Sequence, residues 1–245
     1  MHRIDHVCIG ARNLYEGAAR LRDETGLDSY DGGWNPSSGI AQRIVPLGRH
    51  CYIEINSVID HDTATRHFYG AWYEAVFADA VREDRFLGWV IAVDSMDELH
   101  AIADRIGEPI AAEGKWENGL ELAWKRRLPD GRSHRNENVP DDRHHRWPLG
   151  LPMFMHWPDE ANDHPDTIGD VGPVRHRVRP DGISWVEVGD EATTREWLGP
   201  GLADMDVRFV DRPAGLYAVG IAMPDGEIII RRDPPPLALA RFYTP

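Results

Sequence analysis

The stretch Arg3-Ile4-Asp5-His6-Val7-Cys8-Ile9, followed closely by Asn13-Leu14, opens the chain with an apolar run that contains an acidic residue and a histidine. The β-branched residues predict a strand, and Asn13 is a residue type that caps the helix expected after it. A buried imidazole costs free energy unless a partner satisfies it, so His6 marks a candidate site. The same order of strand and capped helix recurs along the chain and indicates the fold class.

Two later apolar runs carry a polar residue in a similar position. Glu54 lies in Cys51-Tyr52-Ile53-Glu54-Ile55, and His156 lies in Leu151-Pro152-Met153-Phe154-Met155-His156-Trp157. Because side chains alternate between the two faces of a strand, His6 and Glu54 can both lie opposite their aliphatic neighbours. Two imidazoles and one carboxylate form the ligand set of many catalytic divalent-metal sites.

Each of these residues also has a structural interpretation. Taken alone, His6 is typical of a core histidine bonded to a backbone carbonyl, and Glu54 of a salt bridge to a residue such as Arg43. His156, close to the end of its strand, is compatible with a position that faces solvent. In that strand His156 shares a face with Phe154, and we expect this face to line the same inner surface as the other two ligands. Together the three residues favour a metal site.

Strand and helix patterns divide the chain into three successive units, each of them a strand, a helix and several strands. The first has a strand at Ile4–Ile9, a helix at Leu14–Glu24 that stops at Gly26, a Gly/Pro/Ser-rich stretch at 31–39, and strands at Ile40–Leu47 and Cys51–Ile55. The second has a strand at Leu87–Val93, a helix at Met96–Ile106 capped by Asp94 or Ser95, strands at Ile110–Lys115 and Leu120–Arg127, a polar loop at 129–148 and a strand at Met153–Trp157. The third has a strand at Ile183–Val188, a helix at Glu191–Leu198, and strands at Val207–Val210, Leu216–Met223 and Glu227–Arg231.

We therefore expect an α+β protein in which repeated βαβββ units form curved mixed sheets with helices on the convex side. Residues 1–170 are expected to form one domain from two units, at 1–60 and 86–160, and residues 180–233 to add a C-terminal βαβββ-like unit. With 245 residues and 42% hydrophobic content, the chain can bury a sizeable core. A third, unpaired unit leaves sheet edges that need cover, from which we expect a homodimer.

Composition argues against several classes of partner. The net charge of −14 argues against nucleic acid, whose phosphates require a concentrated basic face. No stretch approaches the roughly 18 apolar residues of a membrane span, and no charged-then-apolar secretory leader is visible. Cys8 and Cys51 are the only cysteines. A disulfide between neighbouring strands is one interpretation, but reduced core thiols in a cytoplasmic protein are the favoured one.

Three passages carry a resemblance to a known superfamily: Ile4-Asp5-His6-Val7 with Asn13-Leu14, Tyr52-Ile53-Glu54-Ile55, and the run 151–157 with His164-Pro165 downstream. They resemble the vicinal oxygen chelate superfamily and, within it, the glyoxalase-like domain proteins. The resemblance covers about residues 3–165. It implies a cup of paired βαβββ units in which a divalent metal chelates two neighbouring oxygens of a substrate.

The resemblance also implies where the metal ligands lie, namely on the inner faces of the first and fourth strands of each unit. His6 and Glu54 then belong to the first unit and His156 to the second. Trp89 stands where the second unit would supply a ligand that matches His6, which leaves three ligands for one divalent ion. The ligand types do not distinguish Fe, Zn, Mn and Ni.

Other residues are candidates for the substrate pocket or for proton transfer. Aromatic side chains more often belong to cores, and a strand arginine more often forms a salt bridge, so each also has a structural interpretation. The candidates for substrate binding are Trp34, Arg43, Tyr52, Trp89, Trp124 and Phe154, and the candidates for acid/base catalysis are Glu121 and His67.

These expectations lead to one main functional hypothesis and two alternatives. The main hypothesis is a metal-dependent enzyme of isomerase or lyase type, in which one divalent ion stabilises an oxyanion on a small oxygen-bearing molecule. The first alternative is a non-haem Fe(II) dioxygenase that uses the same His/Glu/His triad. The second is a metal-free protein that binds and sequesters a small molecule.

Overall fold

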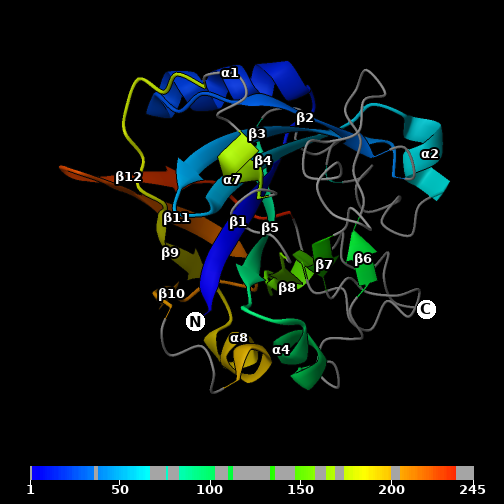
Figure 1. Ribbon diagram of the computed structural model, residues 1–245, viewed down its shortest axis with the longest axis vertical. Helices are drawn as coiled ribbons and strands as arrows, with labels where there is room; N and C mark the ends of the chain where they lie inside the picture. The colour runs from blue at the N-terminus through cyan, green and yellow to red at the C-terminus, as the bar shows by residue number, and fades with distance from the viewer. Residues whose placement is uncertain are drawn as a thin grey trace.

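The structure, a computed structural model, folds into a large mixed sheet and a smaller C-terminal sheet (Figure 1). Helix α1 (Leu14–Thr25) lies along one side of the large sheet, at the top of Figure 1. The residues that the structure describes are 2–35, 38–66, 76, 83–102, 110–112, 133–135, 147–157, 164–168, 174–199 and 205–235.

The first unit follows the predicted order of strand, helix and strands. Helix α1 begins after Asn13, whose Oδ1 accepts hydrogen bonds from Tyr15 N and Glu16 N at 3.1 Å each. It ends at Gly26, which has a left-handed φ of 78° and donates its N–H to Arg22 O. Both ends carry the capping chemistry that the sequence predicts. The strands of this unit are β1 (Arg3–Gly10), β2 (Tyr30–Asn35), β3 (Ile40–Gly48) and β4 (Cys51–Val58).

The second unit repeats this order. Ser95 caps helix α4, as predicted, by accepting a hydrogen bond from Glu98 N at 3.2 Å. The predicted helix Met96–Ile106 is described only to Ile102, and the predicted strand Leu120–Arg127 lies outside the described residues. The elements from the end of β4 onward are α2 (His61–Arg66), β5 (Arg85–Ala92), α4 (Met96–Ala101), β6 (Ile110–Ala112), β7 (Ser133–Arg135), the 3-10 helix Trp147–Leu149, β8 (Met153–His156) and α7 (Pro165–Ile168).

Strands β1 and β5 lie at the centre of the large sheet and join the two units. The strand order is β2-β3-β4-β1-β5-β8-β7-β6. β1 pairs with β4 in parallel and with β5 antiparallel, and β5 in turn pairs with β8 in parallel. The first and fourth strands of each unit are therefore neighbours, and the strands expected to carry the ligands lie side by side.

Two apolar clusters mark the two faces of the large sheet. The inner cluster has members on β1, β5 and β8, including Cys8, Leu87, Val90, Met153 and Met155. The outer cluster extends to α1 and to the C-terminal sheet, and includes Val7, Ile53, Trp89 and Phe154. The inner face is the one on which a substrate cup is expected.

The C-terminal segment forms a four-stranded sheet that packs on the outer face of the large sheet. Val186, Val219 and Ile230 belong to the outer cluster together with Val7. One face of the C-terminal sheet is therefore buried against the large sheet of the same chain. Its strand β9 is parallel to β10, whereas in the first unit the first strand is parallel to the fourth. Its elements, in the order predicted, are β9 (Ile183–Val188), α8 (Glu191–Leu198), β10 (Val207–Phe209), β11 (Leu216–Met223) and β12 (Gly226–Arg231).

Two strands lie where the sequence predicts loops. β2 lies at 30–35 and so overlaps the stretch 31–39, where glycines obscure the strand pattern, and its pairing with β3 shifts register between Asp31 and Gly33. β7 falls in the polar loop 129–148 and pairs with β6 and β8. Short or glycine-rich strands depend on their neighbours more than on local propensity.

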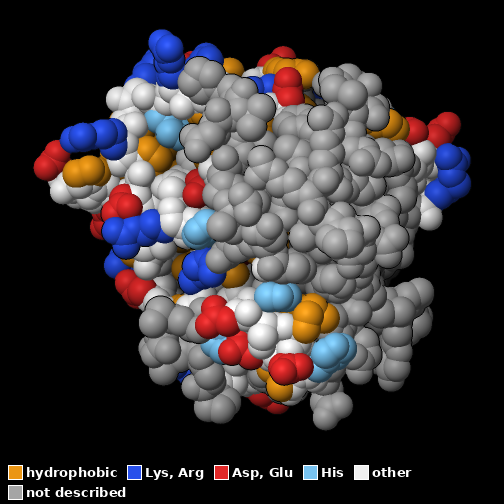
Figure 2. All heavy atoms as spheres, in the orientation of Figure 1, with side chains coloured by type: hydrophobic (Ala, Val, Ile, Leu, Met, Phe, Trp, Pro, Cys, Tyr) orange, Lys and Arg blue, Asp and Glu red, His pale blue; other side chains and the backbone are white. Residues whose placement is uncertain are grey.

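The described surface is mixed in charge. Figure 2 shows acidic and basic side chains interspersed along the left side of one face. Ion pairs such as Arg231–Glu187 and Arg49–Asp181 join charges of opposite sign on the described surface. Within the described part of the chain, no helix is long and apolar enough to cross a membrane.

Candidate metal site

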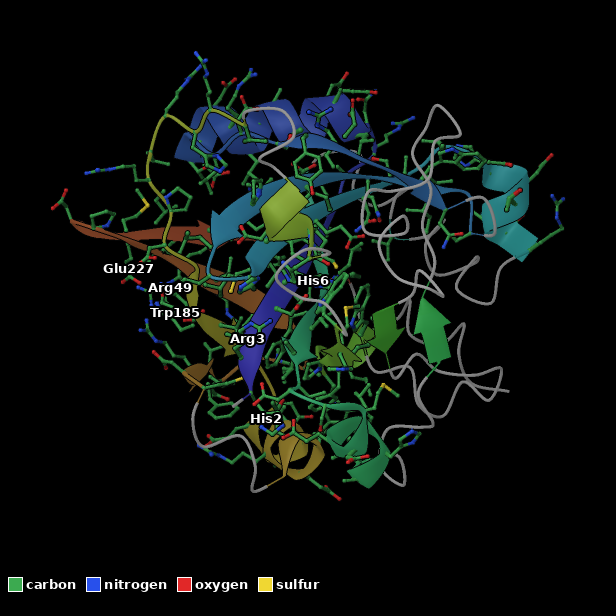
Figure 3. All side chains as sticks on the ribbon, viewed as in Figure 1. His2, Arg3, His6, Arg49, Trp185 and Glu227 are labelled. Carbon is green, nitrogen blue, oxygen red and sulfur yellow. The ribbon has the colours of Figure 1, made fainter. Side chains whose placement is uncertain are left out.

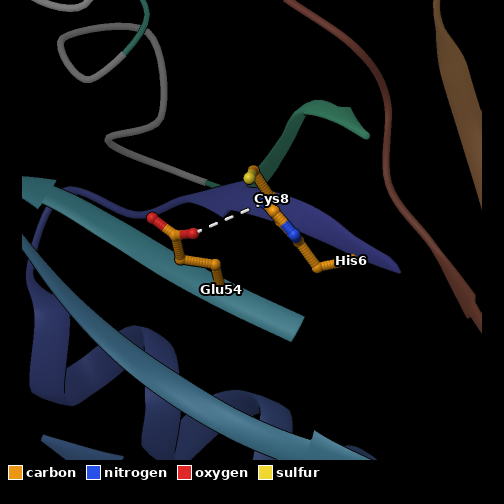
Figure 4. A group of neighbouring side chains, drawn as sticks. All are labelled: His6, Cys8 and Glu54. Carbon is orange, nitrogen blue, oxygen red and sulfur yellow. Dashed lines mark ion pairs between the residues drawn. The ribbon is translucent and has the colours of Figure 1, made fainter. Parts of the chain in front are cut away.

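Strands β1 and β4 bring His6 and Glu54 together. The strands run parallel, with Cys8 opposite Glu54 and His6 opposite Tyr52. His6 Nε2 lies 3.7 Å from Glu54 Oε2, and ligand atoms of His6, Cys8 and Glu54 lie within 4.8 Å of one another (Figure 4). His6 is only 3% exposed, whereas Glu54 is partly exposed. The site thus combines nitrogen, sulfur and oxygen donors.

Cys8 belongs to this cluster, although the sequence favours a reduced core thiol for it and leaves a disulfide with Cys51 as the alternative. The signal that points to it is its spacing, because it follows His6 by two residues and shares the same face of β1. Cys8 is fully buried, and neither it nor Cys51 forms a disulfide. A thiolate is a soft donor that is typical of zinc sites.

Asp5 holds the other nitrogen of the His6 ring. Its Oδ1 lies 2.5 Å from His6 Nδ1, although adjacent residues of a regular strand point to opposite faces. A register shift between Ile4 and His6 in the β1–β5 pairing supplies the local twist that brings the two side chains together. Because Nδ1 is directed at Asp5, Nε2 is the nitrogen that faces Glu54. Figure 3 labels His6 near the centre of the large sheet.

The carboxylate of Asp5 is completely buried among nitrogen donors. Trp157 Nε1 donates to Oδ2 at 2.9 Å, and His164 Nε2 lies 3.2 Å from the same oxygen. Burial alone would raise the pKa of Asp5, but the adjacent His164 and His6 rings outweigh it and hold the pKa well below its usual value. Asp5 therefore stays ionised at neutral pH and accepts hydrogen bonds through both oxygens.

Tyr52 packs against the His6 ring. The two ring centroids are 4.3 Å apart and the ring planes differ by 19°. Burial, reinforced by the nearby Asp5 and Glu54 carboxylates, raises the pKa of Tyr52 well above its usual value. The phenol is therefore neutral at physiological pH, and its stacking restricts the orientation of His6.

His156 is not brought together with the other two predicted ligands. Its Nδ1 lies 3.3 Å from Val93 O, and it is not part of the cluster of ligand atoms in the described residues. Met153 and Met155 belong to the inner cluster, whereas Phe154 belongs to the outer one. The prediction that Phe154 faces the inner surface is wrong, and alternation directs His156 to the outer side with it. The pairing of β8 with β5 decides which residues face inward.

Two other predicted substrate residues make structural contacts. Trp89 is fully buried in the outer cluster and donates its Nε1–H to Gly150 O at 2.7 Å, so it does not line the inner face. Arg43 donates its Nε–H to Ser29 Oγ at 2.8 Å and forms an ion pair with Asp31. This is the salt-bridge role that the sequence leaves open for Arg43.

Of the remaining predicted residues, the structure describes one. Trp34 is partly buried and packs against the outer cluster. The other three, His67, Glu121 and Trp124, lie outside the described residues.

Comparison with known families decides where the chain belongs. The family model of a glyoxalase-like domain matches residues 4–199. The chain belongs to the glyoxalase-like domain family. The resemblance seen in the opening strand is therefore confirmed, and so is the α+β fold with repeated strand–helix units. None of the curated proteins matches this glyoxalase-like chain.

One solved structure supports the fold of this glyoxalase-like protein over nearly its whole length. A hypothetical protein from Staphylococcus aureus is similar with a TM-score of 0.54 and 14% identity, over 96% of this chain and 86% of that one. Methylmalonyl-CoA epimerase from Mycobacterium tuberculosis is similar with a TM-score of 0.39 and 14% identity, over 62% of this chain and 86% of that one. At this sequence identity the first structure supports only the fold. The TM-score of the epimerase is too low for it to indicate a function.

Proposed function

We propose that this protein is a divalent-metal-dependent enzyme that acts on a small oxygen-bearing molecule, with His6, Glu54 and Cys8 as metal ligands. The observation that carries the proposal is the orientation of His6. Asp5 holds Nδ1, and Nε2 faces the Glu54 carboxylate at 3.7 Å. Metal-binding histidines commonly have this arrangement, in which a carboxylate holds the nitrogen that does not bind the ion.

The distances among the donors support a shared ion. Nitrogen and oxygen ligands about 2.0–2.2 Å from a tetrahedral Zn²⁺ lie roughly 3.3–3.6 Å apart. His6 Nε2 and Glu54 Oε2 are 3.7 Å apart, so a small adjustment lets both contact one ion. The Cys8 thiol favours Zn²⁺ or Fe²⁺ over Mg²⁺ and Ca²⁺. Three protein ligands leave a coordination position for an oxygen of the substrate.

The chain's own residues prepare this site for chemistry of isomerase or lyase type. Asp5 and Tyr52 fix the His6 ring, one at its edge and one at its face. Glu54 is partly exposed, whereas His6 and Cys8 are buried. When bound, the ion supplies Lewis-acid stabilisation of an oxyanion. As residues that move the proton we keep two candidates, Glu121 and His67.

The metal content of the purified protein tests this proposal. We expect the wild-type protein to take up Zn²⁺ or Fe²⁺, and both His6→Ala and Glu54→Ala to bind the ion at least about tenfold more weakly. His61→Ala is the matched control, because His61 is an exposed histidine on α2. Equal metal content in the wild-type, His6→Ala and Glu54→Ala proteins would refute the proposed ligands.

A metal-free binding protein is the second candidate, and one observation favours it. The strands of the second unit that correspond to β1 and β4 bring apolar residues to the inner cluster, among them Val90 and Met153. An apolar wall suits the sequestration of a small molecule. Saturable binding of a small aromatic molecule by a protein that takes up neither Zn²⁺ nor Fe²⁺, and shows no turnover, would support this candidate over the enzyme.

The homodimer stays a prediction. Strands β10 and β12 are the outer strands of the C-terminal sheet, and unpaired strand edges favour association. Light scattering in solution measures the mass, and a monomeric mass across the micromolar range would contradict the prediction.

A further inference from the structure

His164 is linked to the candidate metal site through Asp5. Both side chains are 0% exposed, and His164 Nε2 lies 3.2 Å from Asp5 Oδ2. On its other side, His164 Nδ1 accepts a hydrogen bond from Asp166 N at 3.1 Å, so this nitrogen carries a lone pair. The proton of a neutral ring is then on Nε2, which donates it to the Asp5 carboxylate.

The segment that carries His164 is attached to the first unit. The Asp166 carboxylate accepts hydrogen bonds from Gly48 N at 2.7 Å, at the end of β3, and from His50 N at 3.1 Å, in the turn before β4. These contacts join α7 to the hairpin that contains β4, the strand of Glu54. The segment that carries His164 is therefore held by the Asp166 side chain, through hydrogen bonds that involve none of the proposed ligands.

The hydrogen-bond geometry around the Asp5 side chain assigns the tautomer of His6. A carboxylate accepts hydrogen bonds and donates none, so His6 Nδ1, 2.5 Å from Oδ1, must carry the proton. His6 Nε2 then carries the lone pair that a metal ion needs. Trp157 Nε1 and His164 Nε2 both approach Oδ2, and they keep the carboxylate from turning away from His6.

We propose that Asp5 and His164 are positioning residues, which together hold His6 as the Nδ1–H tautomer and so preset its Nε2 for a divalent ion. The part of this inference that concerns metal affinity rests on the function proposed above. The part that concerns the tautomer of His6 holds for the metal-free protein and is tested separately.

Asp5→Asn tests the inference with almost no change in side-chain shape. Trp157 and His164 both donate toward Oδ2, so the amide oxygen is expected there and the amide NH₂ group is expected to face His6. His6 Nδ1 must then accept, and the proton moves to Nε2, where it blocks metal binding. Nitrogen-15 NMR of the metal-free protein, with the His6 signals assigned by their loss in His6→Gln, reads the tautomer directly.

We expect the wild-type protein to show the Nδ1–H tautomer of His6 and Asp5→Asn to show the Nε2–H tautomer. Zn²⁺ affinity, measured by competition with a chelator, is expected to fall by about 100-fold in Asp5→Asn. It is expected to fall by about tenfold in His164→Phe, which removes a donor to Oδ2, and less in His164→Gln, which keeps an N–H donor. His61→Phe is the control, and thermal unfolding of each metal-free variant verifies that it is folded.

The outcomes separate this inference from the proposed function. An Nε2–H tautomer in the wild-type protein, or an unchanged tautomer in Asp5→Asn, would overturn the inference. Equal Zn²⁺ affinity in the wild-type protein, His164→Phe and His164→Gln would overturn the role of His164. If the tautomers behave as expected but the wild-type protein binds no Zn²⁺, the proposed function fails while the positioning of His6 by Asp5 stands.

Discussion

The two units of the large sheet have the same strand arrangement but different inner faces. In the first unit, β1 and β4 bring His6, Cys8 and Glu54 within reach of one another. In the second unit, β5 and β8 bring apolar residues such as Val90 and Met153 to the same face. Among the described residues, the second unit therefore repeats the strand and helix order of the first without repeating its cluster of metal donors, and the proposed metal site lies on the first unit alone.

The outer faces of the same strands are alike. Val7 and Ile53 of the first unit and Trp89 and Phe154 of the second all belong to the outer cluster, which also includes residues of the C-terminal sheet. In both units this outer face buries apolar area, which stabilises the fold. At these positions the two units are alike, whereas their inner faces differ.

The largest expected effect comes from the outer face of the second unit. Trp89→Ala removes a fully buried indole and its hydrogen bond to Gly150 O. We expect the free energy of unfolding to fall by about 3–5 kcal/mol, measured by urea denaturation, with Zn²⁺ binding retained while the protein is folded. Trp89→Phe keeps an aromatic ring at this position and serves as the milder variant. A loss of Zn²⁺ binding in the folded Trp89→Phe protein would show that the second unit contributes directly to the site.

The next largest effect is a loss of Zn²⁺ affinity. A matched pair of substitutions, one in each unit, compares the two inner faces. Glu54→Gln removes a carboxylate donor from the first unit, and we expect Zn²⁺ affinity to fall by roughly 10–100-fold. Met153→Leu conserves apolar volume in the second unit, and we expect no change in that affinity. Chelator competition measures both. Equal effects of the two substitutions would remove the asymmetry on which the proposed function rests.

A smaller effect is expected at the helix starts, where the two units should behave alike. Asn13→Ala removes the cap of α1 and Ser95→Ala removes the cap of α4. Each loses side-chain hydrogen bonds to the first helical turn, and we expect each to lower the free energy of unfolding by about 1 kcal/mol. Urea denaturation of the two single variants measures this, and a loss in only one of them would show that the units differ in their scaffold as well.

The smallest effect is a pH dependence where the C-terminal segment meets the first unit. His176 Nδ1 accepts from Asp28 N at 2.8 Å, and its Nε2 lies 2.7 Å from Pro46 O. Burial lowers the pKa of His176 below its usual 6.5, although Pro46 and Asp28 oppose the shift. The neutral ring is favoured in the folded state, so its contribution to stability is present above pH 6.5 and is lost as pH falls through the folded-state pKa.

His176→Gln provides the comparison for this effect. We expect the wild-type protein to lose more stability between pH 7.5 and pH 5.5 than the variant does, because the variant lacks the titrating ring. Urea denaturation at both pH values measures the difference. An equal loss in the two proteins would show that other groups account for the acid sensitivity.

The features that the sequence predicts well depend on near neighbours in the chain. Asn13 and Ser95 identify the helix starts, and alternation places His6 and Glu54 on one face of their strands. Parallel pairing of β1 with β4 then brings the two together, as the resemblance to the family implies.

The features that the sequence does not predict depend on contacts between distant segments. The four residues of β8 alternate equally well in either orientation, and only pairing with β5 turns Met153 inward and Phe154 outward. Asp5 escapes prediction because the register shift beside it breaks the regular alternation of β1. His164 reaches Asp5 from a segment 159 residues away in the chain, which local patterns cannot reveal.

In the function proposed here, the inner face of the first unit, and not that of the second, holds a metal ion. Anomalous diffraction from crystals soaked in Zn²⁺ tests it most directly. We expect a peak within about 2.3 Å of His6 Nε2, a Glu54 carboxylate oxygen and Cys8 Sγ. A well-occupied peak elsewhere in the cup, or none beside His6 in crystals that hold Zn²⁺ at other sites, would contradict it.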